Sequence, residues 1–235
     1  MQQRKSKKIL IYLFLLILVG SINNIEINKI KFDNINKITI NGLGENENKI
    51  LLNDIKKLKL GNIFSIKKDD LSRIIEKSSL VQSYKIFKVY PSTLNIKILK
   101  TEYIAQINKE NKIYFVGTNG KYSKNKVLKN DLPFIFGKPD IKEILKFKKI
   151  IDQSKLSYDQ IKYLYYFPSG RWDIELINNI LIKLPKDNII EILDDVFDFI
   201  NNNNFKKVKF YDARIKNQII VNDWRFTIRN LFIHL

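Results

Sequence analysis

The residue types that could carry chemistry are few in this sequence. It contains no cysteine, and its one histidine, His234, stands next to the last residue. A disulfide framework, a cysteine and histidine zinc site and a histidine-based catalytic triad are therefore excluded. Neither of the glycine-rich loops that bind phosphate, G-x-G-x-x-G and G-x-x-x-x-G-K-[ST], occurs. These absences remove most of the common hydrolase, oxidoreductase and nucleotide-binding classes.

The strongest cluster of acid/base or metal-binding groups is a run of four carboxylates. Glu191, Asp194, Asp195 and Asp198 are spaced i, i+3, i+4, i+7, so on a helix they share one face. Such a face could bind calcium or exchange protons. The intervening apolar residues form a stripe of their own: Ile189, Ile192, Leu193, Val196, Phe197 and Ile200. We therefore interpret the acids as the solvated face of an amphipathic helix, and expect no catalytic residue, metal or cofactor.

Aromatic residues gather at Tyr163, Tyr165, Tyr166 and Phe167, close to lysines. Rings in such a setting can stack on bases or sugars. They can equally fill the core of a strand, with tyrosine hydroxyls at its rims. We favour core packing, and expect no small-molecule substrate.

The chain is strongly basic, with 42 lysines and arginines against 24 acids and a net charge of +18. A charge of this size is typical of proteins that bind nucleic acid or anionic surfaces. The cations are mostly lysines spread along the chain, however, and they form no single stripe. We interpret them as a solvated surface and expect no nucleic acid partner.

The first residues indicate a segment directed to a membrane. A basic stretch, residues 1–8, precedes an apolar run that includes Ile9, Leu10, Tyr12, Phe14, Leu16, Leu18 and Val19. Residues 9–22 would cover about 21 Å as a helix, short of a bilayer core of about 30 Å, which suits a cleaved signal peptide. The poor cleavage site at 19–21 and the polar flanks suit an uncleaved anchor. Both readings place the cations in the cytoplasm and the rest outside.

Residues 35–103 are expected to form a compact α+β domain. The pattern predicts a strand over 37–41, helices over 48–58 and 68–77, and strands over 81–90 and 94–102. The order is β-α-α-β-β. Tyr90-Pro91-Ser92-Thr93 suits the turn between the last two strands, because proline cannot pair in a ladder.

Residues 104–222 are expected to form a second domain, built on a mainly antiparallel sheet with flanking helices. The helices are predicted over 141–151 and 188–200. The strands are predicted over 103–107, 112–116, 122 onward, 133–136, 161–167, 171–177, 180–184, 207–211 and 218–221. Residues 223–235 form a C-terminal tail of unassigned role, for which a docking helix or strand is conceivable.

The order of these elements resembles a known family. Residues 37–102 resemble a POTRA domain, including Gly61-Asn62-Ile63-Phe64 and the hairpin at 90–94. One POTRA domain after a short N-terminal anchor is similar to the bacterial cell division family FtsQ/DivIB. Motifs of the second domain are also similar to that family: LPFIFG at 132–137, RWD at 171–173 with LP at 184–185, and DAR at 212–214. The chain departs from the family pattern at Gly117, residues 100–102, Asn179 and Ala213.

The resemblance implies a non-enzymatic inner-membrane protein of the divisome, with a cytoplasmic tail over 1–8 and a single transmembrane anchor over 9–27. The bulk of the chain would be periplasmic and located at the division septum. It would bind FtsB, FtsL and other divisome proteins, and help to recruit and regulate septal peptidoglycan synthesis. The alternatives are a POTRA-containing periplasmic assembly or translocation component, a peptidoglycan-active enzyme and a nucleic acid binder.

The last predicted strand suggests how partners bind. A sheet that ends in its final strand leaves unpaired backbone groups, which can accept a strand from another protein. We expect residues 214–221 to be this edge and to pair with FtsB, with Ile215, Ile219 and Val221 as side-chain anchors. The expected partner-binding residues are Arg214, Ile215, Lys216, Asn217, Gln218, Ile219, Ile220 and Val221.

Overall fold

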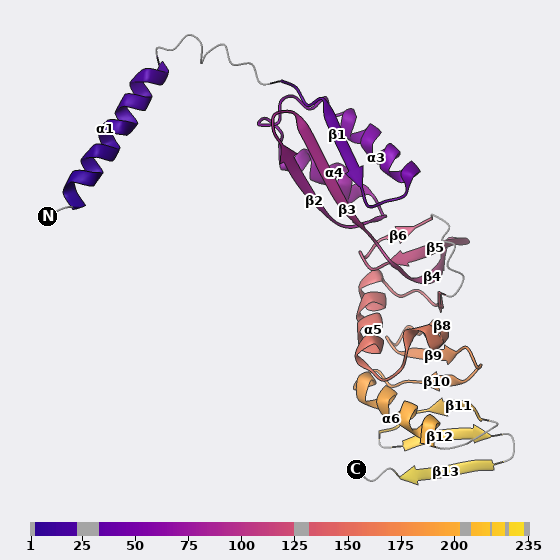
Figure 1. Cartoon of the computed structure of the whole chain (residues 1–235). Helices are drawn as coiled ribbons and strands as arrows, with labels where there is room; N and C mark the ends of the chain where they lie inside the picture. Colours follow the sequence, from indigo (N-terminus) through magenta and orange to yellow (C-terminus); the bar gives the residue numbers. More distant parts are fainter. Residues whose placement is uncertain are drawn as a thin grey trace.

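The computed structural model describes residues 3–22, 33–124, 132–202, 208–216, 218–223 and 226–232. An N-terminal helix, α1 (Gln3–Ile22), precedes two α+β units (Figure 1). The first unit holds a three-stranded sheet and the second a ten-stranded sheet. The predicted α+β class is confirmed.

Helix α1 is 20 residues long, and its large apolar side chains from Ile9 to Val19 are exposed. In the described parts of the chain, no helix combines the length and apolarity that crossing a bilayer requires. Residues 23–27 of the expected anchor lie outside the described residues.

The first unit has the predicted β-α-α-β-β order. Its elements are β1 (Lys37–Asn41), α3 (Glu45–Lys56), α4 (Lys68–Lys77), β2 (Val81–Val89) and β3 (Thr93–Lys100). Strand β3 lies in the centre of the sheet, parallel to β1 and antiparallel to β2. Helix α3 starts earlier than predicted, since Glu45 and Glu47 in its first turn stabilise the positive end of a helix.

The core of this unit forms where β3 meets α4. Leu94, Ile96 and Ile98 alternate along β3 and point to one face, where they are buried. Leu71 and Ile75 of α4 belong to the same buried cluster. Burying each such side chain contributes about 1.5–3 kcal/mol, so this apolar face holds the helix on the sheet.

The second unit contains the remaining elements. They are β4 (Tyr103–Lys109), β5 (Lys112–Gly117), β6 (Tyr122–Ser123), β7 (Phe134–Phe136), α5 (Ile141–Gln153), η1 (Tyr158–Gln160), β8 (Ile161–Tyr166), β9 (Trp172–Leu176), β10 (Leu181–Lys183), α6 (Ile189–Asn202), β11 (Val208–Asp212), β12 (Gln218–Asp223) and β13 (Phe226–Phe232). The strand order is β13-β12-β11-β10-β9-β8-β7-β4-β5-β6.

The prediction of a mainly antiparallel sheet needs correction, because the sheet is mixed. Strands β4 and β7, β7 and β8, and β10 and β11 pair in parallel. For the last two pairs the physical reason is that α5 connects β7 to β8 and α6 connects β10 to β11. A helix between two neighbouring strands brings the chain back to the same end of the sheet, so the second strand runs parallel to the first.

Both long helices of this unit cover the same face of the sheet (Figure 1). Beneath them, one row of paired residues crosses seven strands, and every member is buried: Ile107, Ile135, Leu164, Ile174, Ile182, Tyr211 and Val221. Trp172 joins this core to α5, since its ring stacks on Phe147 with centroids 4.6 Å apart. The opposite face carries no described helix.

The glycine of the 132–137 motif has a clear backbone role. Gly137 adopts a φ of +98°, a conformation that residues with a side chain rarely take. A Cβ atom there would lie 2.2 Å from the carbonyl oxygen of Tyr166. The chain can therefore leave β7 beside β8 only with glycine at this position.

The turn between β5 and β6 joins the two units. The Asn119 side-chain amide donates to the carbonyls of Ser79 (2.9 Å) and Val81 (3.0 Å). Beside it, Thr118 Oγ1 donates to Gln82 Oε1 at 2.8 Å. Lys121 Nζ donates to the carbonyls of residues 76 and 78, at the negative end of α4. Hydrogen bonds thus hold the turn against the loop that leads into β2.

Asn119→Ala should lower the free energy of unfolding by about 1–2 kcal/mol, because it leaves two partly buried carbonyls without their donor. Urea denaturation followed by circular dichroism measures this change. Asn41→Ala, at an exposed end of β1, is the matched control and should change stability by less than about 0.5 kcal/mol. Equal stability of the two variants would contradict the role of the turn.

Candidate partner-binding site

The expected partner-binding residues fall on a loop and the strand that follows it. Arg214, Ile215 and Lys216 lie between β11 and β12, and all three are exposed. Residues 218–221 belong to β12. Asn217 lies outside the described residues. The structure therefore keeps these residues in one continuous segment.

The expectation that this segment ends the sheet is wrong. Strand β12 pairs with β11 on one side and with β13 on the other, and β13 comes from the C-terminal tail. The sequence pattern identified the strand but could not show what lies beside it. The pairing with β13 is irregular, with a register shift between Ile219 and Val221.

Two of the three expected anchors face the interior. Ile219 and Val221 are 7% and 6% exposed and belong to the main core. Ile215 is 51% exposed and is the one anchor available at the surface. Side chains alternate along a strand, so the residues that pack under α6 cannot also face a partner on the other side.

A bidentate ion pair shapes the loop before β12. Arg214 donates from Nε to Asp212 Oδ1 (2.7 Å) and from Nη2 to Asp212 Oδ2 (2.5 Å), and its backbone N–H also donates to Oδ1. Burial would raise the pKa of Asp212, but these hydrogen bonds outweigh burial and lower the pKa below its usual 3.8. The same contact raises the pKa of Arg214. The DAR motif is therefore a closed turn at the end of β11.

A second acid, Asp173 of the RWD motif, is buried beside β10. It accepts a hydrogen bond from the backbone N–H of Leu184 (3.2 Å), and Arg171 Nε lies 3.3 Å away in an ion pair. Burial raises the pKa of Asp173, and Arg171 and the Leu184 N–H oppose this effect. The Arg171 guanidinium also lies over the Phe167 ring, 4.2 Å from its centroid. The RWD and LP motifs thus close one hairpin.

A hollow of about 320 Å³ lies between this loop and the start of α6. Apolar side chains line part of it, and charges of both signs surround them. Its lining residues are Pro185, Lys186, Asp187, Asn188, Glu191, Ile192, Asp195, Ala213, Arg214, Ile215, Lys216, Gln218 and Ile219. A mixed lining of this kind suits a peptide with apolar and charged side chains.

The four carboxylates of α6 form a solvated face of the helix, and two of them contact the loop that follows α5. Lys155 donates its backbone N–H to Asp194 Oδ1 (2.6 Å) and its ammonium to Asp198 Oδ2 (2.5 Å). Partial burial raises the pKa of Asp195, and the neighbouring carboxylates Glu191, Asp198 and Asp194 add to this. Across the described residues, no group of histidine, cysteine or acidic side chains is arranged to hold a metal ion.

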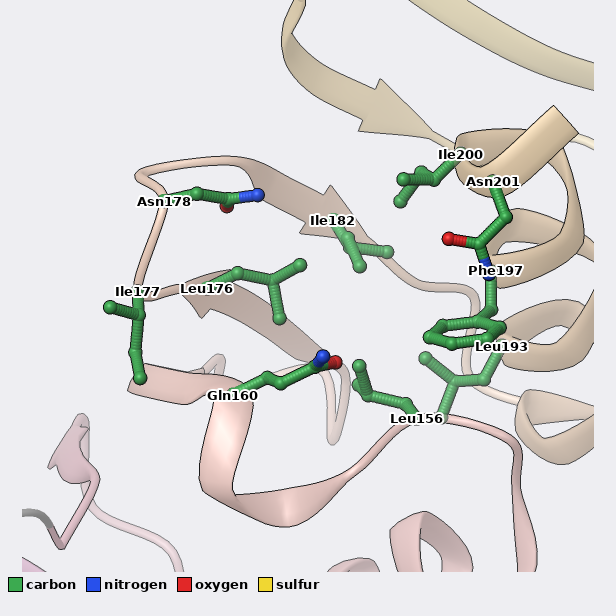
Figure 2. A pocket seen from close by; sticks show the side chains of 10 residues that line it. All are labelled: Leu156, Gln160, Leu176, Ile177, Asn178, Ile182, Leu193, Phe197, Ile200 and Asn201. Carbon is green, nitrogen blue, oxygen red and sulfur yellow. The ribbon is translucent and has the colours of Figure 1, made fainter. Parts of the chain in front are cut away.

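The other end of α6 lines a second hollow, of about 360 Å³. Figure 2 shows Leu176, Ile182 and Leu193 around it, with Gln160 and Asn178 among the surrounding residues. None of its lining residues is charged. It therefore offers neither an acid/base pair nor an activated nucleophile.

Two protein-family models match adjoining parts of the chain. The one described as "POTRA domain, FtsQ-type" matches residues 34–103. The one described as "Cell division protein FtsQ/DivIB, C-terminal" matches residues 105–214. The chain belongs to the FtsQ/DivIB family. The resemblance inferred from the motifs is confirmed.

Curated relatives agree with the FtsQ/DivIB assignment. The chain is 24% identical over 181 residues to "Cell division protein FtsQ" of Rickettsia typhi, which covers 71% of this chain and 64% of the relative. It is 27% identical over 168 residues to the protein of the same name from Rickettsia prowazekii, covering 69% and 62%. The chain thus spans just under two thirds of the length of these relatives.

A solved structure of the FtsQ/DivIB family can also be superposed. It is the major extracytoplasmic domain of the trans isomer of the division protein DivIB from Geobacillus stearothermophilus. The alignment covers 44% of this chain and 96% of that one, with 14% identity and a TM-score of 0.31, too low to bear on the fold.

FtsQ/DivIB is a family of non-enzymatic division scaffolds, in agreement with the expectation that the chain is not an enzyme.

Arg214→Ala should destabilise the protein by about 1 kcal/mol at pH 7, a value reduced because Arg214 is partly exposed. The folded pKa of Asp212 lies below 3.8, so its contribution is fully present above pH 3.8 and is lost as pH falls through the lowered value. The difference between wild type and variant should therefore shrink near pH 3. Urea denaturation at pH 7 and pH 3 measures it. Arg214→Lys keeps the positive charge but cannot form the bidentate contact with Asp212. Its free energy of unfolding should lie between those of wild type and Arg214→Ala. A pH-independent difference would contradict the ion pair.

Proposed function

We propose that the chain is a non-enzymatic, membrane-anchored component of the divisome that acts at the division septum. The observation that carries this proposal is the order of its parts. An FtsQ-type POTRA domain at 34–103 is followed directly by an FtsQ/DivIB C-terminal domain at 105–214. A scaffold of this kind would help to recruit and regulate septal peptidoglycan synthesis through its contacts with other division proteins.

The anchor in this proposal is the segment 9–27 in the inner membrane. Arg4, Lys5, Lys7 and Lys8 precede its apolar part, and an excess of cations marks the cytoplasmic side of a membrane segment. The apolar run is short, but a bilayer can thin and flanking lysines can extend toward the headgroups at modest cost. The rest of the chain would then be periplasmic.

A fluorescent fusion of the full chain, replacing the native gene, should gather at midcell in constricting cells. Phe14→Lys/Leu16→Lys should disperse this signal and release the protein from the membrane fraction, because each charge opposes insertion by about 2.5–3.5 kcal/mol. A wild-type signal spread evenly along the envelope during constriction would contradict the divisome role.

We further propose that FtsB, together with FtsL, binds at β12 and at the hollow beside it. A strand of FtsB would pair with β12 in the place now held by β13. The irregular register between β12 and β13 supports this exchange, since a bulge interrupts the ladder that a partner strand could complete. Ile215, which lines the hollow and is exposed, would be the side-chain anchor.

Ile215→Asp should weaken FtsB binding by about tenfold or more, because it places a charge where an apolar contact forms. Ile113→Asp is the matched control: Ile113 is 55% exposed on β5, near the far end of the same sheet. Titration of the full chain with the periplasmic region of FtsB measures both affinities. Equal affinity for both variants would remove Ile215 from the site. Proline at Ile219 or Val221 is unsuitable as a test, because both positions are buried and paired with β13, and Val221 is paired with β11 as well.

Ending the chain after Asp223 tests the exchange of strands. The truncated protein should bind FtsB at least as tightly as the full chain, since no bound segment has to be displaced first. Loss of binding would show that FtsB needs β13 and would contradict pairing at β12. Circular dichroism of both chains verifies that the remaining fold is retained.

A further inference from the structure

One end of the POTRA domain is the end at which the chain arrives from α1. Residues 34–36 pair there with the loop at 61–62 and with Ser92, in the turn between β2 and β3. Strand β3 begins at this end, here called the entry end, and runs to the opposite end, where it leads into β4 (Figure 1). The entry end is therefore the part of the POTRA domain that is remote from the second unit.

Two aromatic rings lie exposed at the entry end. Phe64, in the loop before α4, is 54% exposed, and Tyr90, in the turn before β3, is 59% exposed. Their ring centroids are 5.1 Å apart. Asn62 fixes the loop, because its side-chain oxygen accepts from the backbone N–H groups of Phe64 and Ser65, each at 3.0 Å. The two rings thus form an apolar patch that is held at the surface.

The elements of the entry end carry an excess of positive charge. They are residues 33–37 and residues 54–70, from the last turn of α3 to the first turn of α4. Two acids there form ion pairs, Asp54 with Lys57 at 2.6 Å and Asp70 with Arg73 at 3.1 Å. Within the described chain, the exposed charges of these elements that form no ion pair are five lysines and two acids: Lys37, Lys56, Lys59, Lys67, Lys68, Asp33 and Asp69. Exposed rings among lysines suit a surface that is anionic outside and apolar beneath.

The length of chain before the entry end keeps it close to the membrane of the proposed anchor. Asp33, the first described residue of this unit, follows Ile22, the last residue of α1, by eleven residues. An extended chain spans at most about 3.6 Å per residue, so these two residues cannot be more than about 40 Å apart. Such confinement acts as a high effective concentration, on the order of millimolar for short linkers. A surface contact that is weak on its own is therefore sufficient.

We propose that the entry end of the POTRA domain docks on the surface of an anionic lipid bilayer. Phe64 and Tyr90 lie at the level of the headgroups, where aromatic rings are enriched, and the lysines contact anionic headgroups. Docking depends on the proposed anchor, because the tether to the same membrane brings the entry end to the surface. It sets the direction of the rest of the chain, since β3 then leads away from the bilayer to the second unit.

The test places one dye at a chosen site, which the absence of cysteine from the sequence makes possible. Asn36→Cys carries nitrobenzoxadiazole at the entry end, and Asn108→Cys carries the same dye on β4 as the control; both positions are exposed. The full chain is inserted into nanodiscs of phosphatidylcholine and phosphatidylglycerol, one chain per disc, that contain doxyl-labelled lipid as quencher. The entry-end dye should be quenched about threefold or more strongly than the control dye, and less strongly in phosphatidylcholine alone.

Two double variants at the entry end remove the two kinds of contact separately. Phe64→Ser/Tyr90→Ser removes the rings, and Lys59→Glu/Lys67→Glu reverses two charges. Each should lower the quenching of the entry-end dye to the level of the control dye, because aromatic insertion and charge attraction act together. Circular dichroism verifies that both variants keep the fold.

Lys142→Glu/Lys146→Glu is the matched control for charge, because it makes the same change in net charge at two exposed positions of α5. It should leave the quenching of the entry-end dye unchanged. Equal quenching of the two dyes, or equal loss in both lysine variants, would overturn docking and leave the anchor intact. A chain that failed to enter the nanodiscs would overturn the anchor and docking together. Quenching that required two chains per disc would make a second copy the occupant, and the proposal would be wrong.

Discussion

The structure depends on a constraint that every open sheet faces: its outermost strands carry backbone groups with no partner inside the sheet. Both sheets of this chain are open. One end of the large sheet stops at the short strand β6, beside the turn that is hydrogen-bonded to the POTRA domain, and the other end stops at β13. The small sheet stops at β1 and β2. One of these edges, at β12 and β13, is the place where we propose that other proteins bind.

The rest of the fold keeps the edges in place. A row of buried residues crosses seven strands of the large sheet, and two helices lie over it. Trp172 connects the row to α5 through Phe147. Asp173 holds the chain at the end of the neighbouring strand β10, and Asp212 holds the chain that follows its own strand β11. Buried or partly buried carboxylates of this kind stabilise only when they are fully hydrogen-bonded. Asp212 fixes the start of the loop at Arg214, and Asp173 fixes the chain that leaves β10.

Much of the secondary structure could be predicted from the sequence. Helix α4 was predicted at its observed ends, because its apolar residues lie on one face and acids and a lysine mark its two termini. Strand β3 follows a clean alternation of buried and exposed residues. Periodicity reports which face of an element is buried, however, and not which element lies beside it. For this reason the parallel pairs β7–β8 and β10–β11 were missed, although a helix was predicted between the strands of each pair.

The candidate site shows the same limit. The strand predicted over 218–221 is confirmed as part of β12, but the prediction that it ends the sheet is wrong because β13 lies beside it. The burial of Ile219 and Val221 follows from the register of β12 on β11, which sequence alone does not contain. The motifs at 171–173 and 212–214 marked important positions, yet only the structure shows that they are ion-pair turns, on the two strands that flank β10.

We propose that this protein acts by offering the edge of a sheet to a strand of a partner protein. Hydrogen exchange on the full chain, with and without the periplasmic region of FtsB, tests it most directly. We expect stronger protection in peptides covering residues 218–223 and faster exchange in those covering 226–232, as the partner strand replaces β13. Binding without any change in exchange along β12 would contradict it.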